Sequence, residues 1–282
     1  MGGTKLDKAC IFGVYEFIGF HLCKRFLENG FSVEGIHLDT ERELFLEEKR
    51  LEVGRNANFN EKSFPLSGQN VETDVTIIPI YDWFMTYTNS KLNYKKLFPK
   101  IVQYLKNAPK TNFVYLLPIQ LLTDWQDGEV EEIRNFIDQT KNMEQCIQYF
   151  YLPTIFGPWQ PDSFLFQREL LHQINNDNVQ IEAREWPFDA IYIEDLLTSL
   201  IERIESGESG SFLIESGIPK SWELCAEILQ LDKSLGKVFD DVKLKVDDGV
   251  KKITLKEVTP YQESLMTQKE HVSYINKMMD LL

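Results

Sequence analysis

Two glycines near the N-terminus, Gly13 and Gly19, stand between a short apolar segment and a segment with helical spacing. Glycine lets a chain turn tightly from a strand into a helix and approach a bound phosphate, which the positive end of the helix stabilises. The residue midway between them is Glu16, whose carboxylate would repel a phosphate. This spacing therefore predicts a phosphate-binding turn that contains one residue opposed to phosphate binding.

The segments around this turn alternate between strand-like and helix-like patterns through the first 150 residues. Short apolar runs predict strands at residues 9–12, 31–38, 74–80, 112–117 and 151–155. Periodic segments predict helices at 17–29, 41–51, 92–106 and 130–150, whereas the polar, Asn-rich segment 53–69 predicts a loop. Strands separated by helices indicate a parallel sheet with helices on both faces. We therefore expect an α/β protein with a Rossmann-like, doubly wound parallel sheet.

The chain is long enough for this sheet and for a smaller C-terminal α/β lobe. We place the Rossmann-like dinucleotide-binding domain at residues 1–160 and the smaller, substrate-type lobe at residues 161–282. We expect an interleaved boundary, in which the segment 188–193 supplies a strand across it. Residues 236–282 carry no pattern that assigns them a role.

Composition and charge exclude several classes of protein. A net charge of −14 argues against nucleic acid and against an anionic membrane as partners, because both attract basic surfaces. No run of about 18 apolar residues predicts a membrane span, and the first residues lack the apolar core of a signal peptide. The four cysteines are far apart and predict free thiols without a metal site. We therefore expect a cytoplasmic protein.

Four segments, in order, resemble those of the extended short-chain dehydrogenase/reductase family, of the NAD-dependent epimerase/dehydratase type. The segments are FGVYEFIGFHL at 12–22, NFVYLLP at 112–118, LPTIFGPW at 152–159 and FDAIYIEDL at 188–196. Each one is weak evidence alone, but their order and intervals fit the family over residues 8 to 235. The resemblance implies a Rossmann-like fold, a nicotinamide cofactor and a sugar-nucleotide or related substrate.

The resemblance also implies where the catalytic residues belong. The family moves a proton with a tyrosine that is followed four residues later by a lysine, after a strand that ends in serines. Lys141 fits the lysine in this sequence, but the other positions are changed. The replacements are Ile137 for the tyrosine, Leu117 and Pro118 for the serines, and Leu152 for the arginine of the third segment. The redox chemistry of the family is therefore expected to be lost, and Lys141 is either a vestige of the motif or an ordinary surface lysine.

The cofactor contacts implied by the resemblance lie at the glycine turn and at the end of the second strand. The turn residues are Gly13, Tyr15, Glu16, Phe17, Ile18 and Gly19. The acidic residue that holds the adenosine ribose falls at His37, with Asp39 two residues later. Asp39 would suit NAD, whereas His37 with Arg42 would suit the 2′-phosphate of NADP, and Lys141 would contact the nicotinamide ribose. The choice between NAD, NADP and no dinucleotide stays open at this stage.

Three functions are compatible with these residues. The first is a degenerate NAD(P)-binding, epimerase/dehydratase-like protein without redox chemistry, which acts as a binding, sensing or assembly protein. The alternative is an active NAD(P)-dependent epimerase/dehydratase or reductase, acting on a sugar nucleotide or a related small molecule with an atypical proton donor such as Tyr115 or Tyr192. The third is a structural subunit without a ligand. Whether the protein is an enzyme therefore stays open.

The sequence also predicts a homodimer and surface-exposed histidines. The family commonly pairs the helices that match 92–106 and 130–150, and both carry apolar residues beyond what one sheet face needs. These are Leu97, Val102, Leu105, Ile133, Ile137, Met143 and Ile147. His172 and His271 lie on predicted helices without a metal-ligand partner at helical spacing, so we expect them at the solvated surface.

Overall fold

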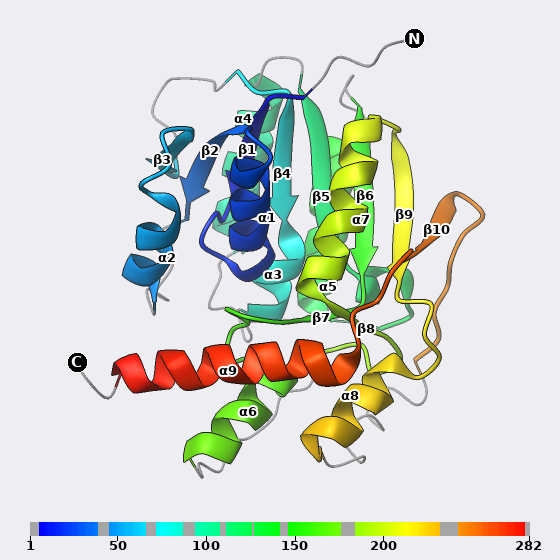
Figure 1. Cartoon of the computed structure of the whole chain (residues 1–282). Helices are drawn as coiled ribbons and strands as arrows, with labels where there is room; N and C mark the ends of the chain where they lie inside the picture. The colour runs from blue at the N-terminus through cyan, green and yellow to red at the C-terminus, as the bar shows by residue number, and fades with distance from the viewer. Residues whose placement is uncertain are drawn as a thin grey trace.

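A parallel sheet of eight strands forms the centre of the protein in the computed structural model (Figure 1). The described residues are 6–38, 45–65, 72–86, 94–107, 111–125, 127–141, 146–175, 184–231 and 242–279. The strands are β1 (Lys8–Phe12), β2 (Ser32–His37), β3 (Phe59–Ser63), β4 (Val75–Pro79), β5 (Asn112–Pro118), β6 (Ile147–Leu152), β9 (Gly210–Glu215) and β10 (Val250–Thr254). Their order is β10-β9-β6-β5-β4-β1-β2-β3, and all neighbouring pairs are parallel.

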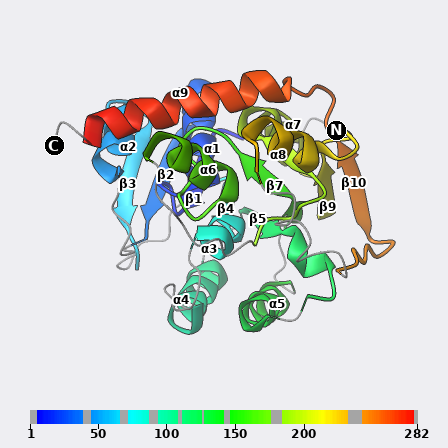
Figure 2. The same ribbon diagram turned by 90° about the horizontal axis from the view of Figure 1, so that it is seen from below.

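Helices cover both faces of this sheet, which confirms the predicted doubly wound α/β fold. The helices are α1 (Phe17–Glu28), α2 (Leu46–Val53), α3 (Ile80–Thr86), α4 (Tyr94–Asn107), α5 (Gly128–Thr140), α6 (Leu165–Asn175), α7 (Ile193–Ser206), α8 (Ser221–Leu229) and α9 (Tyr261–Met279). Helices α1 and α7 lie on one face, and α4 and α5 lie on the other (Figure 2). Helices α6, α8 and α9 lie beyond the carboxyl ends of the strands (Figure 1).

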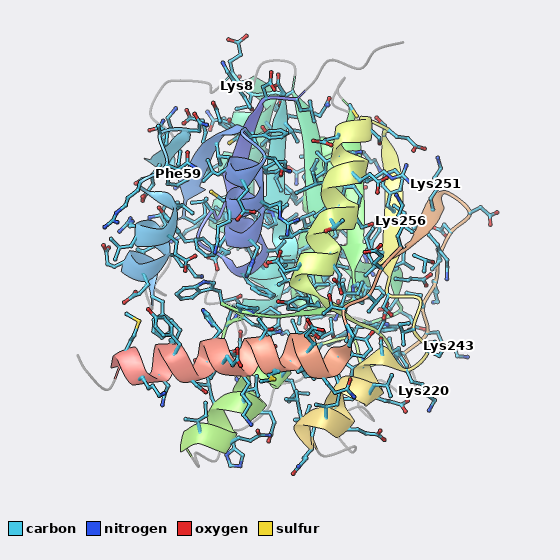
Figure 3. The ribbon with its side chains drawn as sticks, in the orientation of Figure 1. Lys8, Phe59, Lys220, Lys243, Lys251 and Lys256 are labelled. Atoms are coloured by element: carbon cyan, nitrogen blue, oxygen red, sulfur yellow. The ribbon has the colours of Figure 1, made fainter. Side chains whose placement is uncertain are left out.

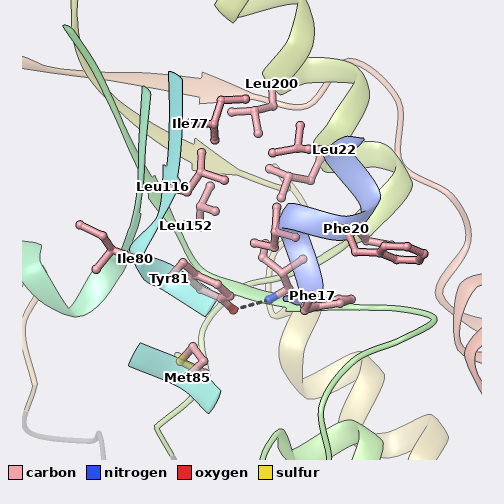
Figure 4. Close-up of a cluster of buried hydrophobic side chains, with 14 of the residues drawn as sticks. Phe17, Phe20, Leu22, Ile77, Ile80, Tyr81, Met85, Leu116, Leu152 and Leu200 are labelled. Carbon is pink, nitrogen blue, oxygen red and sulfur yellow. Dashed lines mark hydrogen bonds between the residues drawn. The ribbon is translucent and has the colours of Figure 1, made fainter. Parts of the chain in front are cut away.

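The core forms where one helical face meets the apolar strands. Leu22 of α1 and Leu200 of α7 gather over Ile77 of β4, Leu116 of β5 and Leu152 of β6 (Figure 4). All five side chains are fully buried. Strands covered on both faces need continuous apolar runs rather than alternation, which is why β4 and β5 were recognisable in the sequence.

Two predicted elements were wrong. The predicted loop at 53–69 contains β3, which pairs with β2 at the edge of the sheet. Its polar sequence hides it because an edge strand is only half covered, and all its side chains are partly or fully exposed. The predicted helix at 130–150 ends at Thr140, and strand β6 begins at Ile147. Pro153 then separates β6 from the short strand β7 (Thr154–Phe156).

The small sheet joins segments on both sides of residue 160. Strand β8 (Ala190–Tyr192), within the segment 188–193, pairs with β7 in a separate two-stranded sheet. The strands that return to the large sheet are β9 and β10, which both follow residue 160. The chain therefore crosses between the lobe and the sheet more than once. None of the helices in the described ranges is long and apolar enough to span a bilayer.

The apolar residues behind the dimer prediction are largely used within one chain. Val102 and Leu105 of α4 and Ile133 of α5 are buried, and Ile147 lies in β6 rather than on a helix. Met143 lies outside the described residues. Leu97 and Ile137 are only partly buried, and the homodimer stays a prediction.

Lysines protect one edge of the sheet. Lys251 lies on the edge strand β10 and Lys256 lies just after it (Figure 3). Their ammonium groups pair with the carboxylates of Glu208 and Glu202, respectively. Charged side chains on an edge strand oppose pairing with a further strand, so they help to end the sheet at β10.

Candidate ligand-binding pocket

A cavity of about 250 Å³ lies at the carboxyl ends of β1 and β2. Gly13 after β1, His37 at the end of β2 and Thr86 at the end of α3 line it from the side of the sheet. The strand order reverses here, since β1 separates β2 and β3 from β4 and the strands beyond it. Open α/β sheets bind ligands at such a point. The volume is slightly below the ~300–1,000 Å³ typical of ligand pockets.

The other walls come from parts of the chain that are distant in sequence. Helix α9 crosses beneath the carboxyl ends of the strands and supplies one wall (Figures 1 and 2). The lining residues outside the sheet side are Phe45, Leu46 and Lys49 at α2, Trp159, Gln160, Pro161 and Asp162 after β7, Gln167 and Leu171 of α6, and His271, Val272, Ile275 and Asn276 of α9. The pocket therefore has mainly apolar and aromatic walls with a few polar groups, as small-molecule sites do.

The glycine turn has the geometry that the sequence predicted. Gly13 adopts a φ of +60°, and the amide of Glu16 donates to the carbonyl of Gly13 at 2.8 Å. A Cβ on Gly19 would lie 2.4 Å from the same carbonyl oxygen. Only glycine fits at position 19, because no real Cβ atom approaches a backbone atom so closely. The turn brings α1 tightly against β1, with Glu16 as the residue that precedes the helix.

A buried carboxylate occupies the start of α1. Asp82 of α3 accepts hydrogen bonds from the amides of Ile18 and Gly19 at 2.8 and 3.0 Å. Burial raises the pKa of Asp82 to about 7, although the two amides oppose the shift. Its second oxygen, Oδ1, has no hydrogen-bond partner within the described part of the chain. The sequence analysis missed Asp82, and the available signal was a single carboxylate inside a long apolar segment.

A buried ammonium group lies beside the turn. Lys49 of α2 donates to the carbonyl of Tyr15 at 2.6 Å, and its Nζ lies 5.4 Å and 5.5 Å from the ring centroids of Phe20 and Trp159. Burial lowers the pKa of Lys49 to about 8, although the nearby carboxylate of Glu16 opposes the shift. Lys49 was also missed, because its helix has the charge pattern of an exposed surface.

His37, the residue expected to contact the adenosine ribose, lies beside a network of hydrogen bonds and ion pairs centred on Glu61 of β3. The carboxylate of Glu61 accepts from the Tyr15 hydroxyl at 2.7 Å and from Arg50 at 2.7 Å, and the His37 ring lies 4.0 Å away. Burial raises the pKa of Glu61, but hydrogen bonds from Arg50 and Tyr15 outweigh it and lower the pKa. Glu61 thus supplies a carboxylate beside His37. Asp39 and Arg42 lie outside the described residues.

His271 lines the pocket instead of lying at the solvated surface, so that prediction was wrong. The amide of Trp159 donates to Nδ1 of His271 at 3.3 Å, and the two rings pack with centroids 4.5 Å apart. Burial lowers the pKa of His271 to about 4, so the ring is neutral at pH 7. Trp159 adopts a φ of +63°. Non-glycine residues in this conformation are uncommon and concentrate at functional sites.

Three glutamines attach α9 to the rest of the pocket. The amide nitrogen of Gln268 donates to the side-chain oxygens of Gln160 and Gln167, at 2.7 and 2.9 Å. All three are buried. These bonds place His271 and the apolar residues of α9 against the cavity.

The residues proposed for catalysis lie elsewhere. Lys141 follows the last residue of α5, is exposed and pairs with Asp138 at 2.7 Å. Since α5 returns from the carboxyl end of β5 to the amino end of β6, Lys141 and Ile137 lie at the end of the sheet opposite the pocket. Tyr115 is fully buried, and its ring stacks on that of Tyr149 at 5.2 Å. The cavity lining includes neither Lys141 and Ile137 nor the candidate donors Tyr115 and Tyr192.

Comparison with known proteins establishes a shared fold. The sequence matches no protein-family model and no curated protein. The structure resembles UDP-glucuronic acid 4-epimerase from Bacillus cereus in complex with NAD, with a TM-score of 0.66 and 13% identity over 95% of this chain and 99% of that one. It also resembles dTDP-glucose 4,6-dehydratase from Bacillus anthracis in complex with NAD, with a TM-score of 0.65 and 9% identity over 95% and 97% of the two chains. An NAD-dependent NDP-hexosamine 5,6-dehydratase, TunA, has a TM-score of 0.62 and 11% identity over 95% and 98%.

Proposed function

We propose that this chain is a divergent relative of the NAD-dependent epimerases and dehydratases that binds a small molecule without carrying out nicotinamide-dependent redox chemistry. The observation that carries this proposal is the lack of a proton-carrying tyrosine between β5 and β6. The sequence holds no tyrosine between Tyr115 and Tyr149, so the conclusion does not depend on matching Ile137 to one particular position. β5 ends in Leu117 and Pro118, which have no hydroxyl to hold a substrate.

The cavity supports a binding or sensing role. It has aromatic walls, a neutral histidine and a buried lysine, and it lies where this fold receives ligands. A cytoplasmic location and a homodimer belong to the same proposal.

The second candidate is an active NAD(P)-dependent enzyme on a sugar nucleotide. It is favoured by the fold, since the B. cereus epimerase has been crystallised with UDP-glucuronic acid and NAD. It requires a proton donor other than Tyr115, because burial raises the pKa of that phenol far above its ordinary value and the side chain does not line the cavity.

Cofactor titration and a turnover assay separate the two candidates. Purified protein is titrated with NAD, NADH and NADPH by calorimetry, and is assayed with UDP-glucuronic acid and NAD for epimerised product. We expect no turnover, since loss of general acid–base catalysis alone lowers the reaction rate by about 10²–10⁴-fold. Epimerised product formed by the wild type would overturn the proposal and support the enzyme.

A matched pair of variants tests the pocket itself. Native mass spectrometry and thermal-shift screening against a metabolite library identify ligands of the wild type. Leu171→Trp fills the cavity and is expected to abolish binding, whereas Leu51→Trp, at an exposed position of α2, is expected to retain it. Equal binding by both variants would place the ligand elsewhere.

A further inference from the structure

Resting on the proposed function, we infer that Asp82 takes the place of a ligand phosphate at the start of α1, so that the pocket selects small molecules without a phosphate at this position. The amides at the start of a helix have no partner within the helix, and they are the donors that hold a phosphate in this type of turn. Here the amides of Ile18 and Gly19 donate to the carboxylate of Asp82. The protein therefore supplies its own acceptor for these amides.

Asp82 is held in place by its neighbours on α3. Tyr81 and Trp83 are both buried, and the Tyr81 hydroxyl accepts a hydrogen bond from the amide of Ile155 at 2.9 Å. The Trp83 indole nitrogen lies 2.9 Å from the point where a Cβ on Gly13 would lie. This packing fixes the backbone of Asp82 beside the amides that its carboxylate contacts. A ligand phosphate therefore has to displace a buried, anchored group.

The charges around the turn also oppose a phosphate. Glu16 supplies a carboxylate and Asp82 a partly ionised one, whereas Lys49 supplies one ammonium group that already donates to the carbonyl of Tyr15. A phosphate brought to this turn would meet a net negative charge in a poorly solvated place, where Coulomb repulsion is strong.

The remaining surface indicates the class of ligand. Phe45, Trp159, Leu171, Val272 and Ile275 give the cavity apolar and aromatic walls. A volume of about 250 Å³ suits a molecule smaller than a dinucleotide. The geometry fits an uncharged aromatic molecule that packs against these walls and has no phosphate to place at α1.

The test is to remove the internal carboxylate. Calorimetry measures the binding of inorganic pyrophosphate, ADP and adenosine to the wild type, to Asp82→Ala and to Asp82→Asn. We expect no detectable pyrophosphate or ADP binding by the wild type, and at least tenfold tighter ADP binding by Asp82→Ala with adenosine unchanged. Asp82→Asn keeps an oxygen on the amides and is expected to remain unresponsive.

A second buried carboxylate provides the control. Glu185 accepts a hydrogen bond from the amide of Leu165 at the start of α6, at 2.5 Å. Glu185→Ala loses a comparable bond without opening α1, and it is expected to gain no ADP affinity. If Asp82→Ala does not fold, amide NMR shifts of Ile18 and Gly19 in the wild type decide the question, because a shift with pyrophosphate would show that the amides are open to phosphate.

The outcomes separate this inference from the proposed function. Pyrophosphate-induced shifts at Ile18 and Gly19 in the wild type, or no gain of ADP affinity in folded Asp82→Ala, would overturn the role of Asp82. Sugar-nucleotide turnover by the wild type would overturn the proposed function. A wild type that excludes phosphate and has no turnover supports both.

Discussion

The hydroxyl of Tyr81 accepts a hydrogen bond from the backbone amide of Ile155 at 2.9 Å, in the centre of the molecule (Figure 4). Tyr81 belongs to α3, which follows the central strand β4, and Ile155 belongs to β7 of the smaller sheet. The bond therefore joins α3, at the carboxyl end of the large sheet, to the strand that leads to the pocket residue Trp159. Both residues are buried, so no water replaces this hydroxyl if it is removed.

Tyr81→Phe is expected to destabilise the protein. The change leaves the amide of Ile155 buried without its acceptor, which costs about 1–3 kcal/mol. The free energy of unfolding in urea measures the loss. Tyr149→Phe is the matched control, because the buried hydroxyl of Tyr149 has no hydrogen-bond partner in the described ranges. Equal losses in the two variants would contradict a role for the Tyr81 bond.

Gly19→Ala is expected to disrupt the first turn of α1. The new Cβ would lie 2.4 Å from the carbonyl oxygen of Gly13, and backbone on both sides would have to move. Such crowding costs about 1–3 kcal/mol or more. Gly128→Ala is the control, since nothing lies within 4 Å of the added methyl group. Thermal melting should show a lower midpoint for the first variant and an unchanged or higher midpoint for the second.

Glu185 is expected to make stability fall as pH rises. Burial raises the pKa of its carboxyl from an ordinary 4.5 to about 8. Between these values the folded protein keeps a proton that the unfolded chain has lost, so the free energy of unfolding decreases with increasing pH. Glu185→Gln has no proton to lose and keeps an oxygen for the amide of Leu165. Its stability relative to wild type should therefore increase from pH 4.5 to about pH 8.

Urea unfolding of both proteins across this range measures the difference. The raised pKa of Asp82 also makes the free energy of unfolding fall with pH. This effect is the same in wild type and Glu185→Gln, so it cancels when the two proteins are compared. Lys49, with a pKa lowered to about 8, makes stability vary with pH only above about pH 8. A stability difference that does not vary with pH would show that Glu185 is ionised in the folded protein.

Gln268→Leu is expected to loosen α9. The substitution keeps the size of the side chain but leaves the side-chain oxygens of Gln160 and Gln167 without their donor. We expect a loss of about 1–3 kcal/mol in stability and faster hydrogen exchange in α9. Gln262→Leu, at an exposed position of the same helix, should leave exchange unchanged. Unchanged exchange in Gln268→Leu would show that apolar contacts alone hold α9.

The parts of the fold that local patterns determine were predictable from the sequence. Strands β1, β4 and β5 are continuous apolar runs because both faces of the sheet are covered. The glycine turn was also predictable, since Gly13 and Gly19 meet steric requirements set by neighbouring residues. Strand β3 was not, because a polar edge strand depends on its partner β2 rather than on its own apolarity.

The candidate site was less predictable because folding brings its residues together from distant segments. Asp82, Lys49 and His271 come from α3, α2 and α9, and no short spacing connects them. Lys49 and His271 have the local sequence of exposed helix positions, and only the packing of α2 and α9 buries them. The role of Lys141 stays a prediction, since the motif that suggested it does not specify which end of α5 faces a ligand.

Helix α9 has a consequence for the order in which the protein is made. It forms a wall of the pocket, yet it follows every other described element along the chain. At about 5–20 residues per second, the ribosome makes the turn at Gly13 on the order of ten seconds or more before His271. The sheet can begin to assemble during translation, but the pocket cannot close until α9 has emerged. Ligand binding should therefore distinguish chains translated through α9 from prematurely terminated ones, and a ligand would selectively protect the former from proteolysis.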